Sequence, residues 1–165
     1  MVTTVTFDIA QSKQLSLMVT FAKAFADADF ATIEHILTED CVYHGMPRSM
    51  RWPPRPKQEF LQFAATYRGN FISFNNELKW PADSPGRTIC FIDTNGTTKD
   101  GRAYAQEIMM IIEFKTEDGE IKISQIREYI DTKILHMTSY ASLRYVTFLE
   151  RDHRDDYSPA GVTNL

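Results

Sequence analysis

The hydrophobic repeat of this chain changes near residue 70, and this change limits the possible folds more than any other feature. Before residue 70, apolar residues recur every three or four positions, as they do on one face of an α-helix. After it, apolar and polar residues alternate over four successive segments, as they do in β-strands with one buried face. A group of helices followed by a group of strands predicts an α+β fold.

Three helices are predicted before the change. The spacing of apolar residues predicts them over residues 12–27, 29–38 and 56–69. Asp8 and Gln11 can form a capping box at the start of the first helix. These helices supply apolar faces that a sheet must cover.

The strands are expected to form a curved sheet. They are predicted at residues 41–45, 71–79, 87–94, 102–115 and 120–131. Turn residues at 95–101 and at 117–119 connect the last three strands, which therefore form an antiparallel meander. A strongly bent sheet wrapped around the N-terminal helices makes a cone with a pocket at its mouth.

The chain is expected to form a single domain followed by a tail. A final helix is predicted over residues 132–150, and residues 151–165 are polar and loosely held. A chain of 165 residues with 43% hydrophobic residues can bury a substantial core. Residues 1–150 are therefore predicted to be the domain.

Charge and hydropathy exclude several partners. The formal net charge is −4 and no run of lysine or arginine suggests binding to nucleic acid. No apolar stretch approaches the roughly 18 residues that a membrane span needs. No signal peptide is recognisable at the N-terminus, and Cys41 and Cys90 fall within predicted strands. We therefore expect buried, reduced cysteines in a cytoplasmic protein without membrane or nucleic-acid partners.

The last predicted strand carries a carboxylate on an apolar face. Its isoleucines stand at odd positions before residue 124 and at even positions after it. A β-bulge near Ser124-Gln125 accounts for this change and places Glu128 on the inner face. Without the bulge, Tyr129 and Asp131 would face inward instead. Because burial of a carboxylate is costly and raises its pKa, Glu128 is either neutralised by a structural partner or kept for chemistry.

Other polar residues give further catalytic candidates. Asp93 shares a strand face with Ile89 and Phe91, and the alternative to a catalytic role is that it caps the turn that follows. Tyr43 and His44 are neighbours on the first strand, so one of them should point into the pocket. A tyrosine there can donate to a substrate oxygen, and a histidine can act as a base near neutral pH or be purely structural.

Apolar faces also provide the predicted substrate-binding residues. They are Phe25, Trp52, Phe91, Tyr104, Gln106, Ile108, Met110, Ile126 and Ile130. Gln106 is the lone amide on its apolar face, so it either contacts a ligand or bonds to a neighbouring strand. No pair of His or Cys residues has the spacing of a metal site, and no phosphate-binding or dinucleotide motif is present. We therefore predict neither a metal nor a cofactor.

A loop rich in proline precedes the third predicted helix. Residues 46–56 contain four prolines, together with Trp52, Arg48, Arg51 and Arg55. The loop either covers the pocket, with Trp52 over the ligand and an arginine on an anionic group, or is a solvated loop fixed by its prolines.

Two segments resemble the SnoaL-like domains of the nuclear transport factor superfamily. They are residues 21–45, with paired helices leading into a strand, and residues 118–131, the closing strand. The resemblance implies a cone-shaped α+β barrel with a curved mixed or antiparallel sheet. It also implies a cofactor-independent isomerase, cyclase or dehydratase acting on a small lipophilic polyketide or terpenoid of secondary metabolism. A homodimer through the convex face of the sheet is a further implication.

Two enzymes of this superfamily allow a comparison by residue. Tyr43 resembles a catalytic tyrosine of limonene epoxide hydrolase, and Glu128 and Asp93 match its two catalytic acids. Phe91, however, stands at the position of its essential arginine. Scytalone dehydratase is also similar at Tyr43, but residues 25–26 replace its Tyr-Asp pair. The alternatives are therefore a hydrolase related to epoxide hydrolases and a non-catalytic module that binds a hydrophobic ligand or partner.

Overall fold

The computed structural model describes residues 12–47, 49 and 51–131. The capping box at Asp8 and Gln11, the final helix over residues 132–150 and the tail over residues 151–165 lie outside the described residues.

All three predicted helices of the first part are confirmed. They are α1 (Lys13–Ala26), α2 (Phe30–Ile36) and α3 (Lys57–Arg68). The side chain of Ser12 caps α1 by accepting a hydrogen bond from the backbone N–H of Leu15 at 3.3 Å, and Asp29 caps α2 in the same way. The chain turns from α2 directly into a strand, because Leu37 already has extended backbone angles.

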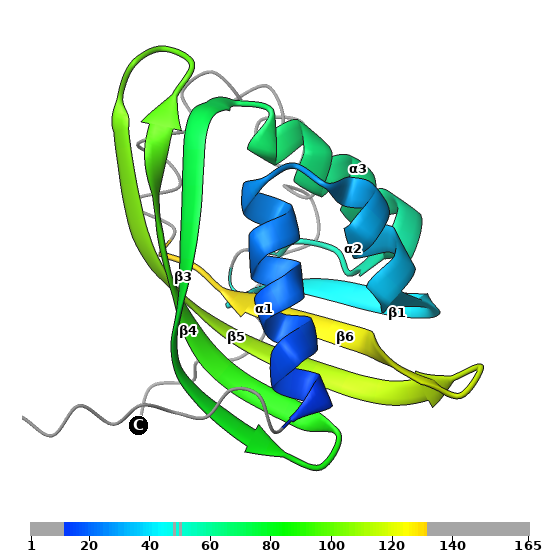
Figure 1. Cartoon of the computed structure of the whole chain (residues 1–165). Coiled ribbons are helices and arrows are strands. Elements are labelled where there is room, and N and C mark those ends of the chain that lie inside the picture. The colour runs from blue at the N-terminus through cyan, green and yellow to red at the C-terminus, as the bar shows by residue number, and fades with distance from the viewer. Residues whose placement is uncertain (1–11, 48, 50, 132–165) are drawn as a thin grey trace, which may run out of the picture.

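The α+β fold is confirmed, with one mixed sheet. Its strands are β1 (Leu37–Met46), β2 (Arg55–Pro56), β3 (Phe71–Ser84), β4 (Arg87–Thr98), β5 (Ala103–Glu117) and β6 (Glu120–Tyr129). Their order is β2-β1-β6-β5-β4-β3, and only β1 and β6 run parallel among these neighbours. The sheet bends around the helices, and α1 lies along its concave side (Figure 1). The concave side therefore holds the main core.

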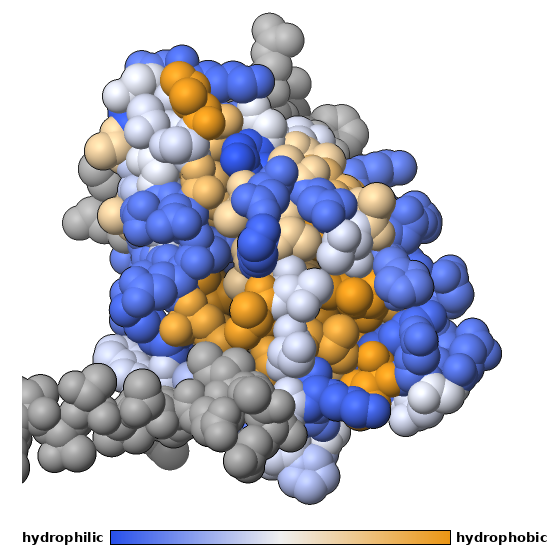
Figure 2. Space-filling view, in the orientation of Figure 1, coloured by the Kyte–Doolittle hydropathy of each residue, from blue (hydrophilic) through white to orange (hydrophobic). Residues whose placement is uncertain are grey.

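Helix α1 does not seal the concave side completely. Figure 2 shows apolar residues at the surface on both flanks of α1, with hydrophilic residues around them. Within the described residues, no helix has the length and apolar character that crossing a membrane requires.

The bulge predicted in the closing strand is confirmed at Ser124. Glu113 of β5 pairs with Gln125 and the next residue, Phe114, pairs with Ile123, so Ser124 is the extra residue. The Ser124 hydroxyl donates to the carbonyl oxygen of Glu113 at 3.2 Å. The bulge reverses the facing of the side chains, so both Ile123 and Ile126 are fully buried. Glu128 consequently faces the concave side.

The predicted facing of β4 is wrong. Its buried residues are Thr88, Cys90, Ile92, Thr94 and Thr98. Ile89 is 38% exposed, and Asp93 lies on the same outer face. The sequence pattern misled because β4 carries large apolar side chains on the convex side of the sheet and threonines toward the core.

The expected turn at Asn95-Gly96 is also wrong. Both residues continue β4, paired with Ala105 and Tyr104, and the chain turns after Thr98 instead. A side chain at Gly96 would collide with the Ser73 carbonyl, so glycine here permits β3 and β4 to approach closely.

Candidate active site

A narrow cavity lies between α1, α3 and the concave face of the sheet. Its volume is about 60 Å³, and half of its lining residues are aromatic. The predicted site residues that line it are Phe25, Tyr43, Trp52, Ile108, Met110, Ile126, Glu128 and Ile130. Lining residues that were not predicted as site residues are Phe21, Phe60, Phe63, Tyr67, Phe74, Asn76, Ile92 and Thr94.

Tyr43 and Glu128 are joined by a hydrogen bond within this cavity. The Tyr43 hydroxyl donates to Glu128 Oε2 at 2.5 Å. The two residues come from β1 and β6, which run parallel, and Glu128 pairs across the sheet with Gly45, two residues beyond Tyr43. Tyr43 is held from the other side by Phe60, whose ring is stacked 4.9 Å away. The pair is therefore fixed by both the sheet and α3.

The surroundings shift both groups toward their neutral forms. Burial raises the pKa of the Glu128 carboxyl, and the hydrogen bond from Tyr43 only partly opposes this effect. Burial, followed by the nearby charge of Glu128, raises the pKa of Tyr43 well above its ordinary value. Tyr43 therefore remains a neutral donor, while Glu128 is the group that can exchange a proton.

A chain of hydroxyl groups holds Tyr67 on the cavity wall. Tyr67 donates to the Tyr104 hydroxyl at 2.8 Å, and Tyr104 donates to Gln106 Oε1 at 2.5 Å. Burial raises the pKa of Tyr104 to about 12 and that of Tyr67 well above its ordinary value. Tyr104 and Gln106 were predicted to bind substrate, but they do not line the cavity. Instead they orient Tyr67, whose hydroxyl is protonated.

A second polar pair lies on the β3–β4 wall. The Thr94 hydroxyl donates to Asn76 Oδ1 at 2.9 Å, and Asn76 Nδ2 donates to the Ala22 carbonyl at 3.2 Å. Asn76 alternates with Phe74 and Leu78 on the inner face of β3. That alternation was the signal in the sequence that could have identified Asn76.

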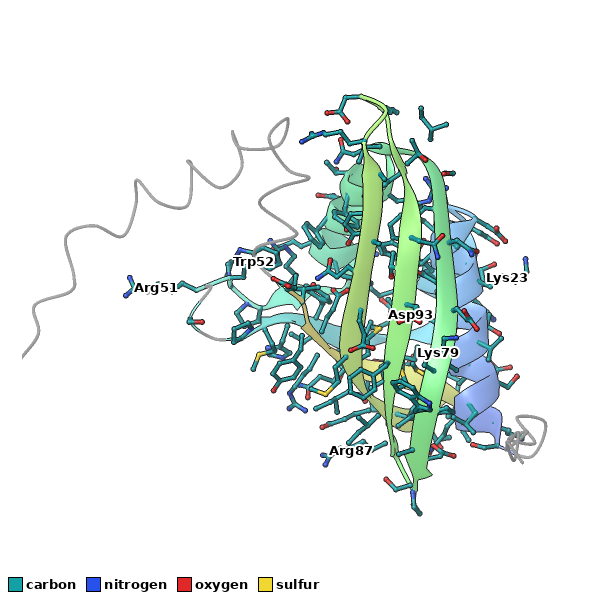
Figure 3. All side chains as sticks on the ribbon, turned by 90° about the vertical axis from the view of Figure 1, so that its left-hand side faces the viewer. Lys23, Arg51, Trp52, Lys79, Arg87 and Asp93 are labelled. Atoms are coloured by element: carbon teal, nitrogen blue, oxygen red, sulfur yellow. The ribbon has the colours of Figure 1, made fainter. Side chains whose placement is uncertain are left out.

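Three predicted site residues lie on the opposite face of the sheet. His44 Nε2 is 3.3 Å from Gln125 Nε2, and Phe91 packs against the ring of Trp80 with centroids 5.8 Å apart. The carboxylate of Asp93 is 3.9 Å from Lys79 Nζ. Figure 3 shows Asp93 and Lys79 together over the strands, with Trp52 off to one side. The structure therefore separates these three residues from the cavity.

The cavity is suited to proton transfer. One carboxyl with a raised pKa accepts a hydrogen bond from the neutral Tyr43 hydroxyl inside largely apolar walls. Among the described residues, no cluster of three or more His, Cys, Asp or Glu residues is arranged to hold a metal.

Solved structures of other proteins share this fold. AusH from Aspergillus nidulans has 19% sequence identity and a TM-score of 0.63, over 73% of this chain and 86% of AusH. BvnE pinacolase from Penicillium brevicompactum has 17% identity and a TM-score of 0.70, over 86% of this chain and 98% of BvnE. TerC, co-crystallised with polyporic acid, has 15% identity and a TM-score of 0.63, over 77% of this chain and 98% of TerC. At such identities the likeness shows the fold alone.

The sequence itself gives the family. Comparison with curated protein sequences yields no significant match. Residues 19–123, more than half of the chain, match the family described as SnoaL-like domain. Together with the cone-shaped α+β fold, this match shows that the chain belongs to the SnoaL-like family.

Proposed function

We propose that this chain is a cofactor-independent acid–base enzyme, an isomerase, cyclase or dehydratase acting on a small lipophilic polyketide or terpenoid of secondary metabolism. The observation that carries the proposal is the hydrogen bond between Tyr43 and Glu128 within an aromatic cavity. Glu128 takes a proton from the substrate and returns it at another position, so no external acid or base is needed.

Tyr43 links proton transfer to substrate binding. While Glu128 is ionised, it accepts the hydrogen bond from the Tyr43 hydroxyl. Once Glu128 has taken a proton, it no longer needs this donor, and Tyr43 can donate to an oxygen of the substrate that has gained negative charge. Each step joins the substrate to one of two side chains that are already in contact with each other.

The lining and the related structures support a lipophilic substrate. Most lining residues are aromatic or aliphatic. BvnE is described as a pinacolase, and TerC was crystallised with polyporic acid, so the fold accommodates an enzyme and a small organic acid. Sites for molecules of that size are typically about 300–1,000 Å³. A cavity of about 60 Å³ must therefore widen by movement of its side chains before substrate enters.

Exchange of Glu128 for glutamine tests the proposal. Native mass spectrometry of the purified protein would first identify a retained ligand or product. We expect Glu128→Gln to lower turnover of the identified substrate by about 100-fold or more. Asp93→Asn is the matched control, since it makes the same exchange on the outer face and should leave turnover unchanged. Full turnover by Glu128→Gln would refute the assignment.

A non-catalytic binding module is the second candidate. It is favoured by the narrow cavity and by walls that are almost wholly apolar. Under this alternative a ligand binds without turnover, and Glu128→Gln binds it as well as the unaltered protein does. The epoxide hydrolase alternative lacks support, because β4 contributes Ile92 and Thr94 to the cavity instead of an acid and an arginine.

We also propose a homodimer through the convex face of the sheet and a cytoplasmic location. Trp80 is 66% exposed on this outer face, and Ile89 and Phe91 lie beside it. Large exposed apolar residues on a sheet face are typical of subunit contacts. Cys41 and Cys90 are buried free thiols, as expected in a reducing compartment.

A further inference from the structure

Arg55 is a buried cation that contacts two aromatic rings but forms no ion pair with a carboxylate of the described residues. Only 9% of its surface is exposed, and its Nη1 atom has no hydrogen-bond partner there. An arginine side chain remains charged at any ordinary pH, and an unpaired buried charge is costly. Such an atom requires an explanation.

A neighbouring cation shows what a satisfied site looks like in this fold. Lys57 is also buried, and its Nζ atom donates to Glu39 Oε1 at 2.7 Å and to the Leu37 carbonyl at 3.5 Å. No carboxylate of the described residues lies within ion-pair distance of Arg55, in contrast. The two cations are two positions apart in the sequence and both are buried. Burial alone therefore does not explain why only Lys57 has a carboxylate partner.

Arg55 is the neighbour of Tyr43 across two strands of the sheet. Arg55 pairs with Tyr43 across β1 and β2, and residues paired in this way project to the same face of a sheet. Its guanidinium carbon lies 4.3 Å from the centre of the Phe63 ring and 5.7 Å from that of Trp52. Both rings line the cavity. The charge of Arg55 also acts on the Tyr43 hydroxyl, where it opposes the rise in pKa that burial causes.

Two aromatic rings, those of Phe63 and Trp52, connect Arg55 to the cavity. Arg55 is not among the lining residues, but both rings that it contacts are. Trp52 is only half-buried and rests on Gly45, where any side chain would collide with its ring. For a ligand in the cavity to reach the guanidinium, this ring must rotate.

We propose that Arg55 binds an anionic oxygen of the substrate, so that the site selects lipophilic acids, carboxylates or enolates, over neutral molecules of the same shape. This inference rests on the proposed function, since it names a substrate class for the same cavity. The planar guanidinium matches a carboxylate with two parallel hydrogen bonds, and the ligand supplies the partner that Nη1 lacks.

Binding of 2-naphthoate and of the neutral 2-naphthamide tests the proposal without requiring turnover. The full chain carries two tryptophans, and Trp80→Phe leaves Trp52 as the only fluorescent one. In this background, we expect both probes to change Trp52 fluorescence, with naphthoate binding about 10- to 100-fold more tightly. Arg55→Gln should abolish this preference while leaving the affinity for naphthamide unchanged.

Two further variants complete the experiment. Arg51→Gln removes the same charge from the same loop, where the exposed side chain of Arg51 projects away from the sheet (Figure 3), and should retain the preference. Arg55→Lys keeps the positive charge but lacks the planar guanidinium, so it should retain only part of the preference for naphthoate. This variant takes the place of Arg55→Gln if Arg55→Gln does not fold.

Several outcomes would overturn the inference. One is that the parent protein binds the two probes with equal affinity. Another is that the Arg55 variants keep the full preference for naphthoate. Loss of preference in Arg51→Gln would attribute the effect to general surface charge and would also refute it. The catalytic proposal fails in a different measurement. It is refuted by full turnover in Glu128→Gln, whereas the role of Arg55 is tested by binding of the two probes.

Discussion

Two glutamates on neighbouring strands show how differently the two faces of the sheet treat charge. Glu113 of β5 lies on the outer face and binds Arg127 at 2.8 Å and Arg87 at 2.9 Å, both through Oε1. The hydrogen bond from Arg127 is the main reason that its pKa is lowered. Glu128 of β6 faces the cavity and has the Tyr43 hydroxyl as its hydrogen-bond donor, and burial raises its pKa. The same side chain is thus stabilised as an anion outside and biased toward the acid form inside.

This difference separates structural charge from chemical charge. A carboxylate fixed between two arginines has no proton to exchange at neutral pH, and its charge is used to hold strands together. A carboxyl surrounded by apolar rings is held close to the point at which it can gain or lose a proton. Only the second environment is suited to catalysis, and the predictions below test that distinction.

The largest loss of turnover is expected from a substitution in β1, where Tyr43 and His44 are adjacent but face opposite sides of the sheet. We expect Tyr43→Phe to lower turnover by about 100-fold, because it removes the donor to the developing charge on the substrate. Loss of this donor should also raise the pKa of Glu128 further, which a pH–rate profile can detect.

The neighbouring residue supplies the control for that experiment. His44→Gln alters the outer face next to Gln125 and should change turnover by less than about twofold. Comparable losses in the two variants would mean that the cavity and the outer face are not functionally distinct.

The sequence was sufficient to predict the closing strand but not β4. The shift of isoleucine positions around Ser124 has one simple structural cause, a bulge, and it correctly placed Glu128. On β4 the apolar residues Ile89 and Phe91 pointed to the wrong face. Alternation identifies the inner face only where the other face is polar, and here the outer face is apolar as well.

Other parts of the site depend on tertiary arrangement. Phe63 and Tyr67 stand out on the apolar face of α3, but the spacing on one helix does not show which of its residues border a cavity. The roles of Tyr104 and Gln106 behind Tyr67 depend on distances between separate elements. Arg55 was one of three arginines in its loop, and its pairing with Tyr43 distinguishes it from the others.

An effect of intermediate size is expected on the outer face. Ile89→Arg places a charge in the proposed dimer contact and should weaken the dimer by about 10- to 100-fold, as measured by analytical ultracentrifugation. The fold should be retained, because Ile89 is already 38% exposed.

Ile72→Arg is the matched control for the dimer contact. Ile72 is 68% exposed and lies at the other end of the β3–β4 hairpin, where its neighbour Phe71 pairs with Thr98, while Ile89 pairs with Ala82. A single monomeric mass for the unaltered protein, or equal weakening by both variants, would contradict a dimer through this face.

The smallest expected effect compares the two glutamates directly. The pKa of Glu113 is lowered in the folded protein, so its ionised form contributes stability above the ordinary value of 4.5, and this contribution is lost as the pH falls through the lowered value. Glu113→Gln should therefore reduce the free energy of unfolding by about 0.5–1 kcal/mol at neutral pH and by less in acid.

The pKa of Glu128 is raised, so its stabilising contribution is present at low pH and is lost as the pH rises through the raised value. Relative to the unaltered protein, Glu128→Gln should thus gain stability as the pH rises, while Glu113→Gln loses it. Urea unfolding at a series of pH values measures how the stability of each variant, relative to the unaltered protein, changes with pH. A change of the same sign in both variants would show that the two glutamates do not lie in opposite electrostatic environments.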